Sequence, residues 1–202
     1  MATPQPTRVL ADLWLSETGE GLWLRRAVLF ALGIAALVIA AKIKVPFWPV
    51  PMTMQTFVVL SIGAAYGMRL GGVTLLGYLA IGALGFDVFT SSSAENYGLA
   101  YMMGGTGGYL VGFFAATLLL GAMARRGWDR HPARMAIAML SGQALIFVPG
   151  VLWLGHLYAD AQGWAWVLEV GFTTFVPAEV LKMGLAILLF PALWRLAGPA
   201  RG

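Results

Sequence analysis

The sequence predicts an all-α integral membrane protein with six transmembrane helices and both termini in the cytoplasm. Of its 202 residues, 59% are hydrophobic and only 11% are charged, whereas a soluble domain is about 25% charged. The apolar residues form six long segments, and the basic residues gather in the connections on one side. We expect a membrane domain over residues 22–197, after a cytoplasmic lead-in of residues 1–21 and before a tail of residues 198–202. Residues 10–15 of the lead-in can form a short interfacial helix.

Several classes of site are excluded by composition. The chain has no cysteine, which removes disulfides, thiolate metal sites and cysteine nucleophiles. Its two histidines, His131 and His156, are too few and too far apart for a histidine-built metal site. The net charge of +4 does not indicate nucleic-acid binding, because the basic residues lie in loops between apolar segments. We therefore expect neither metal nor cofactor.

Six apolar segments are expected to cross the bilayer, for which a helix needs ~20 residues. The third is rich in glycine and must pack closely, and Pro149–Gly150 in the fifth predicts a kink or a frayed upper half. The segments run approximately over Leu22–Ala41, Met54–Tyr66, Leu70–Phe86, Gly107–Met123, Met135–Tyr158 and Val167–Leu196.

The basic residues set the orientation. All ten arginines fall at the two ends of the chain or in the connections around residues 67–69 and 125–134, while the other side holds Lys42 and Lys44. Such a bias places the arginine-rich side and both termini in the cytoplasm. The proline-rich stretch 42–51 and the polar stretch 87–98 then face outside, and the first can form a stiff loop over a binding site.

The last segment carries the most informative residues. Glu179 and Lys182 lie three positions apart, so they share one helix face and can touch. A charge at membrane depth costs roughly 2.5–3.5 kcal/mol on insertion scales. The pair either neutralises itself and locks one helix against its neighbours, or forms a polar recognition point in an apolar pocket. We favour the second interpretation.

Two patterns of small residues indicate close packing. Ala27, Ala31 and Ala35 recur every four residues, which lets another helix approach, either from the same chain or from a separate subunit. The run Gly104–Gly108 lacks the Lys-Ser/Thr and the preceding strand of a phosphate loop. It fits close helix packing or close approach to an apolar ligand.

Four motifs in order resemble the BioY family, the biotin-specific substrate-binding (S) components of energy-coupling-factor (ECF) vitamin transporters. The motifs are Val-Pro-Met-Thr-Met-Gln-Thr at 50–56, Gly-Phe-Asp-Val-Phe at 85–89, the glycine-rich stretch within 98–113, and Phe-Val-Pro-Ala-Glu-Val-Leu-Lys at 175–182. The departures are Asp87 and Gly105, where the family often has proline, and Glu179, where it often has aspartate. The resemblance covers roughly residues 27–193.

The resemblance implies uptake of biotin, bound near the outer face of six helices, by a multi-pass protein of the bacterial cytoplasmic membrane. It implies a transmembrane coupling subunit that grips the row of Ala27, Ala31 and Ala35. It also implies two ATPase subunits that hydrolyse ATP, so this chain is a transporter subunit rather than an enzyme. The main alternative is a stand-alone secondary transporter of biotin or another small vitamin, although the chain shows no internal repeat.

Biotin is polar at two ends, so it suits an apolar pocket with a few placed polar groups. We expect Glu179 to accept a ureido N–H and Lys182 to donate to the ureido carbonyl or to a loop oxygen. Asn96 and Gln55 are further candidates for hydrogen bonds with the ligand. Candidates for packing against its rings are Tyr101, Phe175 and Trp153. Each has an alternative: a solvated loop residue for Asn96, a helix cap or bridge for Gln55, and ordinary core or interface packing for the aromatic residues.

Overall fold

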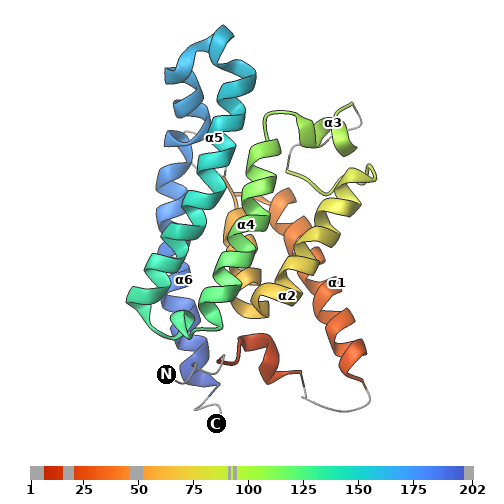
Figure 1. Cartoon of the computed structure of the whole chain (residues 1–202), viewed down its shortest axis with the longest axis vertical. Helices are drawn as coiled ribbons and strands as arrows, with labels where there is room; N and C mark the ends of the chain where they lie inside the picture. Colours follow the sequence, from red (N-terminus) through yellow and green to blue (C-terminus); the bar gives the residue numbers. More distant parts are fainter. Residues whose placement is uncertain (1–6, 16–20, 46–51, 91, 93–94, 198–202) are drawn as a thin grey trace, which may run out of the picture.

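The protein is a bundle of long helices (Figure 1). The computed structural model describes residues 7–15, 21–45, 52–90, 92 and 95–197. The α-helices are α1 (Leu22–Lys42), α2 (Gln55–Ala83), α3 (Gly98–Met103), α4 (Gly107–Ala124), α5 (Pro132–Gly171) and α6 (Val176–Leu196). Short 3-10 helices are η1 (Leu10–Leu13), η2 (Trp128–Arg130) and η3 (Thr173–Phe175), and the two-residue strands β1 (Lys44–Val45) and β2 (Met52–Thr53) pair antiparallel.

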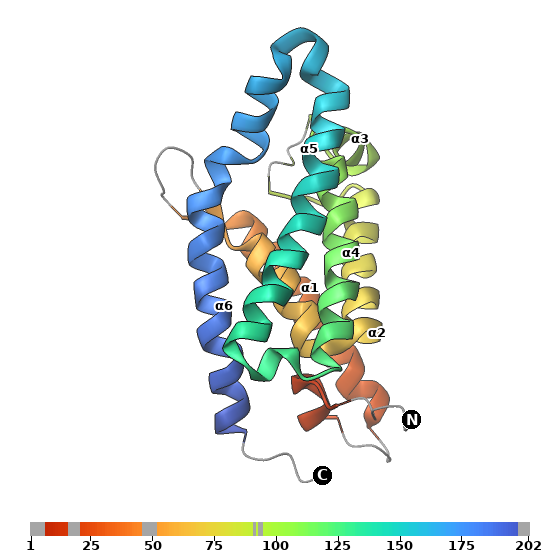
Figure 2. The same ribbon diagram turned by 60° about the vertical axis from the view of Figure 1, so that its left-hand side comes forward.

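Two of the long helices reverse or bend at a glycine. Gly67 in α2 has φ +74° and ψ 174°, and Gly163 in α5 has φ +81° and ψ 156°. Glycine adopts such positive φ values without the steric cost of a Cβ atom. After Gly163 the chain turns back and descends into α6 (Figure 2). The expected kink at Pro149 is not where α5 breaks, since the non-helical dihedrals within it lie at Gly163.

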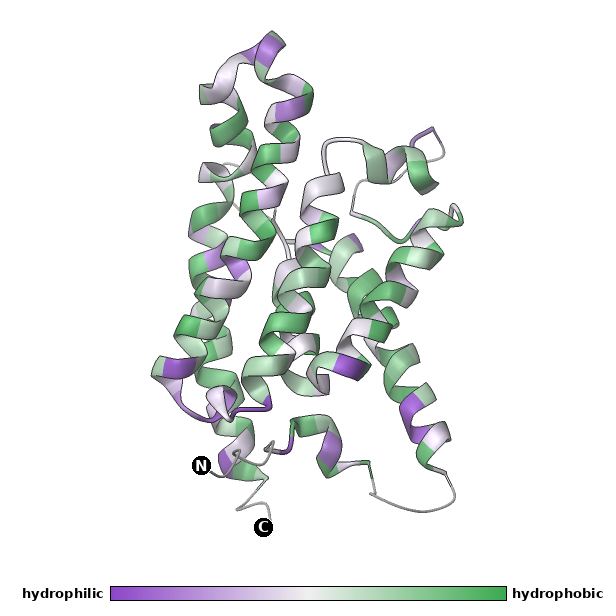
Figure 3. Ribbon diagram, viewed as in Figure 1, coloured by the Kyte–Doolittle hydropathy of each residue, from purple (hydrophilic) through white to green (hydrophobic). Residues whose placement is uncertain are grey.

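The described chain contains four stretches that are long and apolar enough to cross a membrane, namely residues 22–42, 55–83, 107–124 and 132–196. The breaks at Gly67 and Gly163 divide the second and the fourth of these. Hydrophobic residues cover most of the helical surface and hydrophilic residues gather towards the two ends (Figure 3). Large apolar side chains such as Leu188 and Leu152 are exposed, as expected for a lipid-facing surface. Six crossings remain a prediction.

Helix α4 packs between α2 and α5 (Figure 2), and glycine permits this close packing. A Cβ atom on Gly112 would lie 2.7 Å from the Cα atom of Ile146 in α5, and one on Gly121 would lie 2.6 Å from the backbone of Gly67 in α2. Real Cβ atoms do not approach other atoms so closely. Small residues at these positions let the backbones touch.

The start and the end of the described chain lie at the same end of the bundle (Figure 1). The η1 segment is fixed there, because Asp12 pairs with Arg125 after α4 and Val9 is fully buried. Beside it, the indole of Trp194 in α6 donates a hydrogen bond of 2.6 Å to Asp129 in η2. Burial raises the pKa of Asp129 to about 6, although this hydrogen bond opposes the shift.

Replacing Gly112 with alanine should lower the free energy of unfolding by about 1–3 kcal/mol, because the methyl group meets the α5 backbone. The matched control is Gly184→Ala in α6, where an added Cβ has nothing within 4 Å. That change should be neutral or stabilising, since alanine favours helix by about 1 kcal/mol over glycine. Thermal unfolding in detergent measures both, and equal effects would contradict this packing account.

Candidate ligand-binding site

The ion pair of α6 is buried. Pro177, in the first turn of α6, suits a helix start because its missing N–H would have no helical partner there. One turn on, Lys182 Nζ lies 2.7 Å from Glu179 Oε1, and the two residues are only 4% and 8% exposed. Both charges are therefore removed from solvent, which is costly unless further hydrogen bonds satisfy them.

Two residues from other helices supply those hydrogen bonds. The Thr56 hydroxyl in α2 lies 2.9 Å from each carboxylate oxygen of Glu179 and accepts a hydrogen bond of 3.0 Å from Lys182. The side-chain amide of Gln143 in α5 donates to Glu179 Oε2 at 2.6 Å. Thr56, Gln143, Glu179 and Lys182, called here the polar quartet, thus join three helices around one ion pair.

A cavity of about 480 Å³ adjoins the ion pair. Small-molecule sites in proteins typically have about 300–1,000 Å³ and mostly apolar walls with a few polar groups. Aromatic residues form much of the wall, namely Phe89, Tyr101, Tyr109, Phe113, Phe147, Tyr158, Trp166 and Phe175. Glu179, Lys182 and Thr56 lie at its polar part, together with Gln55 and Thr90.

Gln55 is held in a second hydrogen-bonded chain. Its amide nitrogen donates to the Tyr78 hydroxyl at 2.8 Å, and its carbonyl accepts from Thr90 at 2.7 Å. The Tyr78 hydroxyl in turn donates to the Val88 carbonyl at 3.0 Å. Gln55 therefore lines the cavity and also links α2 to the loop after it.

The aromatic wall is ordered by ring contacts. Tyr101 stacks on Phe89 with ring centroids 4.9 Å apart and planes 9° from parallel, which presents a flat apolar surface. On the other side, Phe147 contacts Tyr109 edge-on at 5.9 Å and Phe175 at 6.2 Å. The Tyr109 hydroxyl donates to the Gly171 carbonyl at 2.7 Å, which fixes its ring against the end of α5.

Of the residues expected from the sequence, Glu179, Lys182, Gln55, Tyr101 and Phe175 are brought together around this cavity. Two others lie elsewhere in the described structure. The Trp153 indole donates to the Gly104 carbonyl at 2.9 Å and packs against Gly107 and Gly108, so it supports the turn between α3 and α4. Asn96 is exposed in the loop before α3.

Sequence reasoning did not assign Thr56 or Gln143 to the site. A signal existed for each, since Thr56 follows Gln55 in the proline-rich motif and Gln143 is an amide within an apolar segment. Neither side chain is charged, so neither stands out in the sequence as a residue that is costly to bury at membrane depth. Only the folded structure shows that both contact Glu179.

A surface ion pair joins the end of α1 to the loop after α2. Lys42 at the end of α1 pairs with Asp87, and Ser92 donates a hydrogen bond to the same carboxylate. These two hydrogen bonds lower the pKa of Asp87. Thr53 in β2 lines the cavity, and it is paired with Lys44 of β1. Residues 46–51, expected to form a loop over the site, lie outside the described residues.

Comparisons with known proteins identify relatives of the chain. A model of the BioY family matches residues 10–199. The chain is 32% identical over 161 residues to the probable biotin transporter BioY of Pyrococcus horikoshii, covering 80% of this chain and 91% of that protein. It is 31% identical to the biotin transporter BioY2 of Lactococcus lactis subsp. cremoris, covering 83% and 88%.

A solved structure shows the same fold. It is the crystal structure of the S-component for biotin from an ECF-type ABC transporter, which superposes with a TM-score of 0.69 over 87% of this chain and 94% of that one. Sequence identity is 20%, so this likeness concerns the fold alone. The expectation of an S-component-like helical fold is confirmed.

Proposed function

Because the chain belongs to the BioY family, we propose that it binds biotin in the cavity beside Glu179 and Lys182 and takes it up as the substrate-specific component of an ECF transporter. The observation that carries the proposal is a buried, hydrogen-bonded ion pair at the polar part of an aromatic cavity of about 480 Å³. Biotin has the matching distribution, with an apolar fused ring between a polar ureido group and a carboxylate tail.

The hydrogen-bonding capacity of the ion pair fits the ureido edge. An ammonium group has three donors, and within the described chain Lys182 uses two, on Glu179 and Thr56. A carboxylate has about four acceptor positions, of which Glu179 fills three, with Thr56, Gln143 and Lys182. One donor and one acceptor thus remain side by side. A cyclic urea presents the complementary neighbours, an N–H beside a carbonyl.

The aromatic walls suit the rest of the ligand. The stacked pair of Phe89 and Tyr101 and the cluster around Phe147 and Phe175 surround the cavity with apolar surface. Burying a thiophane ring there removes its carbon atoms from water at about 25 cal/mol per Å². We propose that ring packing supplies affinity while Glu179 and Lys182 supply recognition.

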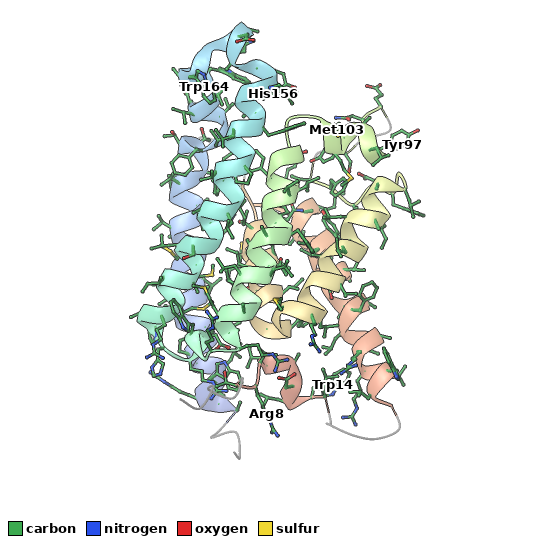
Figure 4. All side chains as sticks on the ribbon, in the orientation of Figure 1. Arg8, Trp14, Tyr97, Met103, His156 and Trp164 are labelled. Atoms are coloured by element: carbon green, nitrogen blue, oxygen red, sulfur yellow. The ribbon has the colours of Figure 1, made fainter. Side chains whose placement is uncertain are left out.

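The proposed topology is six crossings of the bacterial cytoplasmic membrane with both termini inside. Supporting it, Gly67 and Gly163 divide two long helical stretches into four segments, which with α1 and α4 makes six. Arg8 and Trp14 lie at one end of the molecule, and His156 and Trp164 lie at the other (Figure 4). The arginine-rich end carries both described chain ends, as the positive-inside rule requires of a cytoplasmic side.

The proposed partners are a transmembrane coupling subunit and two ATPase subunits. Ala27, Ala31 and Ala35 are all exposed on α1, so this row does not pack within the described chain. Of the four membrane-length stretches, α1 is also the least buried. A row of small exposed residues on a lipid-facing helix suits a partner helix, and we assign it to the coupling subunit. ATP hydrolysis then belongs to the ATPase subunits.

Removing either charge should weaken biotin binding about ten- to a hundred-fold, since a hydrogen bond to a charged group contributes roughly 1.5–3 kcal/mol. Calorimetric titration of biotin into detergent-purified protein, with Glu179→Ala and Lys182→Ala beside the unaltered chain, measures this. Glu169→Ala is the matched control, because Glu169 is exposed near the end of α5. Unchanged affinity in both variants would show that this site assignment is wrong.

Enlarging the row on α1 should separate binding from transport. Ala31→Trp should leave the biotin affinity of the isolated protein unchanged, because Ala31 is exposed and does not line the cavity. Biotin uptake by cells that also express the coupling and ATPase subunits should fall at least tenfold. Ala192→Trp, at an exposed position of α6, is the control. Normal uptake by the Ala31 variant would exclude this row as the docking surface.

A further inference from the structure

A second cavity, of about 730 Å³, lies at the end of the bundle that carries η1. Residues of η1, the first turns of α1 and the bend of α2 around Gly67 line it, and none of these described residues lines the cavity beside Glu179. Hydrophilic residues at this end lie on η1 and on the neighbouring ends of α1 and α2 (Figure 3). The cavity therefore opens where a membrane surface would meet the protein.

The cavity carries unbalanced positive charge. Among the described residues, its lining contains Arg26, Arg69 and Arg125 and one carboxylate, that of Asp12. That carboxylate is already occupied, since it pairs with Arg125 and accepts the backbone N–H of Val9 at 2.9 Å. Within the part of the chain that the structure describes, neither Arg26 nor Arg69 has a carboxylate partner. Two arginines thus remain for an anion.

The rest of the lining is apolar and partly open. Trp23 is 79% exposed and Val73 is 56% exposed, and Phe30 and Leu70 lie beside them. The Arg26 guanidinium lies over the Trp23 ring, 5.5 Å from its centroid, in a cation–π contact. Tryptophan and arginine together are typical of the interface between headgroups and acyl chains. A ligand here must be anionic at one end and apolar at the other.

We propose that this cavity binds an anionic phospholipid, with its phosphate between Arg26 and Arg69 and an acyl chain along the exposed face of Val73 and Leu76. Guanidinium groups bind phosphate oxygens through paired hydrogen bonds, and basic pockets between transmembrane helices on the cytoplasmic side suit anionic headgroups. The apolar wall distinguishes a lipid from free phosphate, which would leave it unused. Ala27 also lines this cavity, so a lipid bound here would lie beside the start of the alanine row assigned to the coupling subunit. The described lining shares no residue with the cavity proposed to bind biotin.

The test is native mass spectrometry of the detergent-purified protein titrated with phosphatidylglycerol or phosphatidylcholine carrying the same acyl chains. Phosphatidylglycerol should bind with higher affinity, and the Arg26→Gln/Arg69→Gln double variant should lose that affinity on the order of ten- to thirtyfold. Arg126→Gln/Arg134→Gln removes the same charge from exposed positions outside the cavity and should bind normally. Where the first double variant does not fold, Val73→Glu, at an exposed position of the cavity lining, replaces it in the same lipid titration. It should likewise bind phosphatidylglycerol more weakly.

Three results would overturn the proposal. Equal binding of the two lipids would show that charge does not select the ligand and would leave the cavity to a protein partner. An equal loss of phosphatidylglycerol affinity in both double variants would show that the arginines act only through general electrostatic attraction. If millimolar inorganic phosphate displaced bound phosphatidylglycerol as effectively as added lipid does, the cavity would be a site for free anions.

Discussion

The buried ion pair of Glu179 and Lys182 sets the constraint on which the site depends. Two charges almost closed to solvent are tolerated only if their remaining donors and acceptors are satisfied. Thr56 and Gln143 provide this from two other helices, so α2, α5 and α6 must meet at one point. Removing one partner would leave the other charge buried and unpaired. The contacts that stabilise the helix junction therefore also form the polar part of the cavity.

Glycine residues determine how the other helices pack around the cavity beside that junction. Gly112 and Gly121 bring the backbone of α4 against α5 and α2, which closes the bundle on one side. The backbone reversals at Gly67 and Gly163 return the chain so that distant segments face one another. The proposed binding site and the proposed docking row then lie on different surfaces, because the cavity lies among the buried helices whereas most of α1 is exposed.

Much of the architecture could be predicted from sequence because its causes are local. Apolar length, the arginine bias and the spacing of Glu179 and Lys182 are all read directly along the chain. The contacts of Thr56 and Gln143 could not be, since a neutral polar residue in an apolar span gives no sign of its partner. Trp153 illustrates the same limit, because an aromatic ring suits a pocket and a helix turn equally well, and only the structure shows its hydrogen bond to the Gly104 carbonyl at the turn.

The most direct test of the central claim, that the polar quartet anchors the ligand, is a structure of the protein determined with biotin bound. We expect the ureido group within hydrogen-bond distance of Glu179 and Lys182, with the fused ring between the aromatic walls and the ion pair intact. Biotin seated away from both residues, with the hydrogen bonds of the quartet unchanged, would contradict the account. The pair would then be a structural lock between helices.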